Sequence, residues 1–128
     1  MIAKVFNRQV VVKGVRVTNP KDQNGFTMMT MTQTNGTNSV DVFGTGGAPA
    51  NMTITAVVAI SKDTTAANIT PKTNGNTVCT IAKGTTAGLA IQGTSLTNTT
   101  VKEGQSVTLL SSSSGDAMVL ISWTFDAA

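Results

Sequence analysis

The chain has 128 residues, of which 40% are hydrophobic and 12% are charged, and its formal net charge is +3. This size fits one domain with one modest core. Because the chain contains no His and only one Cys, the sequence excludes a Ser-His-Asp or Cys-His active site, a His-based or Cys-rich zinc site and an intramolecular disulfide.

The first predicted element is a basic, Val-rich segment at residues 1–24, followed by a body at residues 25–128. A turn-rich run at residues 19–25 marks the boundary. The segment is interpreted either as an arm or as an integral strand with a solvated basic face. An exposed Val-rich strand can add to a neighbour's sheet edge, and its cations can meet an acidic protein surface. The candidate contact residues are the cations that precede the first acidic residue: Lys4, Arg8, Lys13, Arg16 and Lys21.

The spacing of these cations argues against nucleic acid as a partner. They are interleaved with Val instead of clustered, and aromatic residues, on which bases stack, make up only 4% of the chain. A membrane is not expected either, because the longest apolar run, residues 56–60, is too short to cross a bilayer and no signal peptide is visible. We therefore expect a soluble protein that is made in a cytoplasm.

The body reads as a series of short strands. Thr and Val favour strands, Gly, Asn and Ser favour turns, and good helix formers are scarce. Asn35-Gly36 and Asn74-Gly75 are hairpin signals. Residues 61–76 are interpreted as a polar stretch without a strand. The expected strands are at residues 26–32, 40–43, 52–60, 78–82, 89–91, 106–110 and 117–125. With no convincing helix, this pattern predicts an all-β fold, an antiparallel β-sandwich or barrel.

Two strands carry the strongest patterns. The strand at 117–125 is predicted to be central, with Val119, Ile121, Trp123 and Phe125 on one face and Trp123 in the core. The strand at 52–60 is predicted to place one apolar set on a single face: Met52, Ile54, Ala56, Val58 and Ile60. Cys79 is predicted to be a buried, inert thiol.

No arrangement of acidic residues predicts catalysis or metal binding. The six acids lie on different turns or strands without paired spacing, and no Asp-rich calcium loop is present. The run Lys83-Gly84-Thr85 lacks the glycine frame and following helix of a phosphate loop, so we interpret it as a turn. We expect a protein that is not an enzyme and that needs no cofactor or metal.

The C-terminal half resembles a known group of proteins. The resemblance covers residues 77–125 and rests on three runs: TIAKGTTAG (80–88), SLTNTTVKEGQSVTL (95–109) and GDAMVLISWTF (115–125). They resemble the closing strands of tailed-phage virion proteins of the capsid decoration (cement) and head-fibre type. The resemblance implies a jelly-roll-like sandwich and a homotrimer at three-fold or quasi-three-fold positions of a capsid.

The resemblance also implies a function. The first hypothesis is a decoration protein on the virion surface, bound to the major capsid protein and stabilising the head, with residues 1–18 making the main contacts to the capsid or to the adjacent subunit. The second is a fibre or receptor-binding module for a host-surface glycan, which is disfavoured by the small number of aromatic side chains for sugar stacking, four Phe and one Trp. A third is an immunoglobulin-like adhesion domain of a larger surface protein.

Overall fold

The computed structural model describes residues 24–31 and 38–126, and in these ranges the chain forms ten β-strands and no helix. Five strands form sheet A: β1 (Asn24–Met31), β10 (Ala117–Phe125), β3 (Met52–Ser61) and β7 (Ala90–Gln92) in that order, with β8 (Thr100–Val101) also paired with β3. Five form sheet B: β2 (Asn38–Asp41), β9 (Val107–Ser111), β4 (Ala67–Thr73) and β5 (Asn76–Thr77) in that order, with β6 (Ile81–Lys83) paired with β4. Every pairing is antiparallel.

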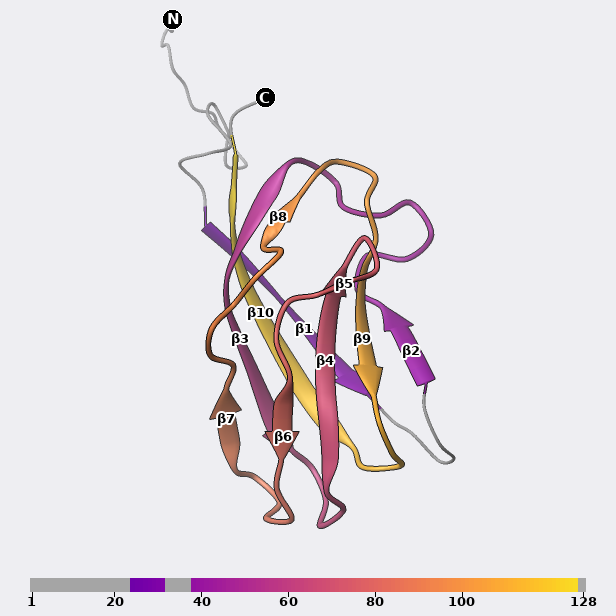
Figure 1. Cartoon of the computed structure of the whole chain (residues 1–128), viewed down its shortest axis with the longest axis vertical. Helices are drawn as coiled ribbons and strands as arrows, with labels where there is room; N and C mark the ends of the chain where they lie inside the picture. The colour runs from indigo at the N-terminus through magenta and orange to yellow at the C-terminus, as the bar shows by residue number, and fades with distance from the viewer. Residues whose placement is uncertain (1–23, 32–37, 127–128) are drawn as a thin grey trace, which may run out of the picture.

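The two sheets face each other and form a β-sandwich, which confirms the predicted all-β class (Figure 1). The core between them draws on alternate residues of both sheets, with Val57 and Val119 from sheet A and Ile69 and Leu109 from sheet B. Full burial of such a side chain contributes about 1.5–3 kcal/mol each.

Strand β10 has the bounds and the role that the sequence predicts. It lies between β1 and β3, and its residues alternate between buried and half-buried positions. Trp123 is 9% exposed and packs edge-on against Phe43 and Phe125, with ring centroids 6.0 and 6.3 Å apart. Its Nε1 has no hydrogen-bond partner among the described residues. The core role of Trp123 is therefore confirmed.

Strand β3 departs from the predicted single apolar face. Ser122 pairs with Ala56 while Trp123 pairs with Ile54, so Thr55 is an extra residue, a β-bulge. A bulge reverses the alternation of the residues that follow it. Met52 and Ile54 are buried before the bulge, but Val57 and Ala59 are buried after it, and the outer face receives Ala56, Val58 and Ile60.

Strand β4 lies within residues 61–76, which are interpreted from the sequence as a polar stretch without a strand. That interpretation is wrong. Ala67, Ile69, Pro71 and Thr73 alternate inward with period two. A proline is tolerated inside this strand because no ladder partner needs its missing N–H: pairing with β6 ends at Ile69 and pairing with β5 begins at Lys72. Between them the Pro71 carbonyl accepts a hydrogen bond from Val78 N at 2.9 Å, while Val78 O accepts from Thr97 N.

The sandwich has two ends with different loops (Figure 1). One end carries the connections β3–β4, β6–β7 and β9–β10, and we call it the closed end. The other carries the β4–β5 turn and the β8–β9 turn, and we call it the open end. The predicted Asn74-Gly75 turn joins β4 to β5, with φ of 48° and 83°, which confirms that hairpin. The Asn35-Gly36 signal lies outside the described residues.

Candidate functional site

The five predicted contact residues are not part of the described structure. Lys4, Arg8, Lys13, Arg16 and Lys21 all lie in residues 1–23, outside the described ranges. Their role, and the boundary between residues 1–24 and 25–128, remain predictions. The site must therefore be sought in the body.

No cluster of side chains that could hold a metal ion is formed by the described part of the chain. Within residues 24–31 and 38–126, no three or more of Cys, Asp and Glu gather where they could hold a metal ion. Cys79 is buried and unbridged, and burial raises the pKa of its thiol. A raised pKa lowers the fraction of reactive thiolate, which fits the predicted inert role.

Asp63 holds the closed end together. The Asp63 carboxylate accepts hydrogen bonds from Lys83 Nζ at 2.6 Å, from Thr65 N at 3.0 Å and from Asp116 N at 2.9 Å. Lys83 Nζ also donates to Thr65 O. The Lys83 side chain is 1% exposed and the Asp63 side chain 33%. These contacts join the β3–β4 loop to the end of β6 and to the β9–β10 loop, so we assign the pair to the fold.

The hydrogen bonds to Asp63 also set its ionisation. The hydrogen bond from Lys83, followed by those from the backbone of Asp116 and Thr65, lowers the pKa of Asp63 from 3.8 to about 2. Each of these donors favours the charged carboxylate. The ion pair is therefore complete at neutral pH.

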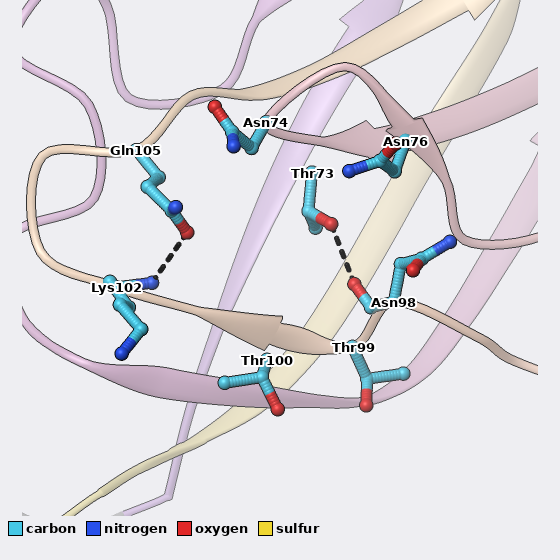
Figure 2. A pocket seen from close by; sticks show the side chains of 8 residues that line it. All are labelled: Thr73, Asn74, Asn76, Asn98, Thr99, Thr100, Lys102 and Gln105. Carbon is cyan, nitrogen blue, oxygen red and sulfur yellow. Dashed lines mark hydrogen bonds between the residues drawn. The ribbon is translucent and has the colours of Figure 1, made fainter.

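The open end carries a polar groove with a volume of about 460 Å³. It lies between the β4–β5 hairpin of sheet B and the segment around β8 of sheet A (Figures 1 and 2). The lining consists of amides, hydroxyls and one ammonium: Thr73, Asn74, Asn76, Asn98, Thr99, Thr100, Lys102 and Gln105. We call these eight residues the polar groove.

Hydrogen bonds fix the walls of the polar groove. Thr73 Oγ1 donates to the backbone oxygen of Asn98 at 2.6 Å, and the Gln105 side chain accepts from Lys102 N at 2.9 Å (Figure 2). Asn98 Nδ2 donates to Thr77 O at 2.8 Å, and Asn74 N donates to Ser106 O at 2.8 Å. Sheets A and B are thereby linked directly across the groove.

The two outer sheet faces differ in chemistry. Four half-buried apolar side chains lie on adjacent strands of sheet A, where Leu120 pairs with Val58 and Met118 with Ile60. On the other side of β10, Met28 of β1 pairs with Leu120. We call Val58, Ile60, Met118 and Leu120 the sheet A patch. On sheet B, the corresponding half-buried Leu110 pairs with Ser39 and Thr70.

No family model matches the chain and no curated protein matches it. In the described ranges, no helix has the length and apolar character needed to span a membrane. Evidence on function therefore comes from the chemistry of the chain itself.

Sequence reasoning did not identify the polar groove or the sheet A patch. The local signals present were the Asn74-Gly75 turn and the polar run at residues 97–100. These segments meet only because β5 pairs with β4 while β8 pairs with β3, in opposite sheets. The sheet A patch depends on the bulge at Thr55, and the pattern of residue types in this strand does not predict a bulge there.

Proposed function

We propose that the chain is a structural virion protein: a capsid decoration protein that binds the outside of a phage head as a homotrimer and stabilises it. The observation that carries this proposal is the sheet A patch. It gives the protein an uncharged apolar face through which it can associate.

The strand connections support the jelly-roll form of this fold. The first four strands alternate between sheets A and B, and β9 and β10 again lie in opposite sheets. Repeated crossing between two sheets is typical of interlocked Greek keys, the arrangement of jelly rolls in viral shell proteins.

The occupant that we propose for the sheet A patch is a second copy of the chain. The outer positions of β3 and β10 around the patch carry Thr, Ser and Ala and no charge. Because an uncharged apolar face best matches another such face, repetition of this contact around a three-fold axis buries the patch.

The distribution of charge supports a separate contact with the capsid. Residues 1–23 carry five cations and one acid, a net +4, while residues 24–128 carry four cations and five acids, a net −1. The basic segment can therefore meet an acidic capsid surface without repulsion from the body. The contact between copies of the chain and the contact with the capsid then use different parts of the chain.

The trimer is tested with two matched leucines. Leu120 and Leu110 are both half-buried on the outer face of a central strand, but only Leu120 lies in the sheet A patch. Light scattering should give about three times the chain mass of 13.1 kDa for the unaltered protein and for Leu110→Lys, and a single chain mass for Leu120→Lys. A monomeric unaltered protein, or dissociation by both variants, would contradict the trimer.

Capsid binding is tested by co-sedimentation with phage heads from the culture that produces the chain. Replacement of the five cations of residues 1–23 by Gln should abolish co-sedimentation. The matched control replaces Lys62, Lys72 and Lys102 by Gln and should bind normally. Undiminished binding after loss of the five cations would exclude them as the contact, and no binding of the unaltered protein would overturn the decoration role.

A further inference from the structure

The polar groove has unused hydrogen-bonding capacity. Among the described residues, the side chains of Asn76, Thr100 and Lys102 have no hydrogen-bond partner, and all three are exposed. They come from β5, from β8 and from the turn after β8, and they line one groove. A ligand in the groove therefore meets donors and acceptors from both sheets.

The backbone of the groove is held in place, so binding requires little ordering of the main chain. The Thr73–Asn98 and Gln105–Lys102 hydrogen bonds hold its two walls. Asn74 and Asn98 both have left-handed backbone conformations, with φ of 48° and 52°. Asn adopts this conformation more readily than most residues, and at Asn74 it belongs to the Asn74-Gly75 hairpin. A rigid site loses less free energy on binding than a flexible one.

The lining selects the chemical class of the ligand. Amide and hydroxyl side chains both donate and accept, which matches the hydroxyl groups of sugars. The groove offers no aromatic side chain, so neither nucleobases nor sugar rings can stack there, and a sugar would be held by hydrogen bonds alone. Its volume of about 460 Å³ lies within the range of small-ligand sites. The single cation, Lys102, suits one carboxylate.

We propose that the polar groove binds an oligosaccharide, with an acidic sugar unit beside Lys102. This inference goes beyond capsid decoration and does not rest on it, because the sheet A patch and residues 1–23 take no part in the groove. On a virion, such a groove would attach the particle to a carbohydrate surface. Binding by single subunits is weak because hydrogen bonds to the sugar replace hydrogen bonds to water.

The test uses the full-length, isotope-labelled chain and NMR titration with two probes, sialyllactose and neutral lactose. Sialyllactose at concentrations on the order of 10 mM should give saturable shifts confined to the polar groove and its flanks. Lys102→Gln should weaken binding of sialyllactose about tenfold, because it removes the charge that faces the carboxylate, and should weaken lactose binding much less. The double variant Asn76→Ala/Thr100→Ala should weaken binding of both sugars.

Matched controls make each outcome decisive. Lys62→Gln removes an exposed cation outside the groove and should leave both titrations unchanged. Acetate, the third probe, should bind more weakly than sialyllactose. Absence of saturable shifts with sialyllactose, shifts outside the groove, or equal affinity for acetate would overturn the proposal. None of these results depends on trimer formation or capsid binding.

Discussion

The two ends of the sandwich use polar side chains in opposite ways. At the closed end, Asp63 accepts hydrogen bonds from Lys83, Thr65 and Asp116, and the buried ammonium is paired. At the open end, the side chains of Asn76 and Thr100 line a groove without partners among the described residues.

The difference separates stability from binding. Polar groups that hydrogen-bond to one another hold loops together, and removal of one group leaves its partner unpaired, which lowers the free energy of unfolding. Polar groups that face solvent from a rigid groove contribute little to folding, so they can be changed for recognition without loss of the fold. Substitutions at the closed end should therefore affect unfolding, and those at the open end should affect ligands.

The largest expected effect is from Asp63→Asn. The substitution leaves the Lys83 ammonium, 1% exposed, without a carboxylate, and an uncompensated buried charge is strongly destabilising. Chemical denaturation should show the greatest fall in unfolding free energy of all the variants considered for the two ends. The double variant Asp63→Asn/Lys83→Met should recover part of the loss, because it removes the charge as well. Unchanged stability of Asp63→Asn would remove the contrast between the ends.

A smaller effect is expected from Gly115→Ala at the same end. A Cβ at Gly115 would lie 2.6 Å from Thr65 O and 3.0 Å from Lys83 Nζ. Such overpacking should lower the unfolding free energy by about 1–3 kcal/mol. Gly84→Ala is the matched control, because nothing lies within 4 Å of its Cβ position, and thermal melts should show it to be nearly neutral. Equal melting temperatures for the two variants would be the contrary result.

The stability of the closed end should also depend on pH. The pKa of Asp63 is about 2 in the folded chain against an ordinary value of 3.8. Because the folded value is the lower one, the contribution of Asp63 is complete above about pH 4 and is lost as the pH falls from 3.8 through 2. Denaturation curves in this range should show the advantage over Asp63→Asn shrinking with acidification. An advantage independent of pH would sink this account.

The smallest effect is expected at the open end. Asn76→Ala and Thr100→Ala each remove an exposed side chain that has no partner among the described residues. Calorimetry should place both within about 0.5 kcal/mol of the unaltered protein. A loss as large as that of Gly115→Ala would mean that the groove residues serve the fold.

Much of the fold could be predicted from the sequence, because alternation and turn chemistry are local. β10 has its predicted bounds, and Asn74-Gly75 forms the predicted hairpin. Strand β4 could not be predicted because Pro71 and the polar residues Asn68 and Lys72 obscure the period-two pattern that Ala67 and Ile69 begin. The reason that Pro71 is tolerated, a gap in pairing between β6 and β5, is a property of the assembled sheet.

The candidate site could not be predicted in the same way. The groove joins residues such as Thr73 and Asn98, which are 25 positions apart and lie on segments of different sheets. The expected contact residues in residues 1–23 remain predictions, because they lie outside the described structure. Local patterns reveal which residues form strands, whereas binding surfaces depend on which strands become neighbours.

The unpaired Thr55 sets the phase of the second half of β3. Deletion of this one residue would remove the bulge, so that the residues after it would point to the opposite faces of the sheet. Val58 and Ile60 would then turn inward, and Val57 and Ala59 would turn outward. Both sides would still be hydrophobic, so the chain could fold around the wrong set. A single extra residue thus divides the apolar residues of β3 between the core and the sheet A patch.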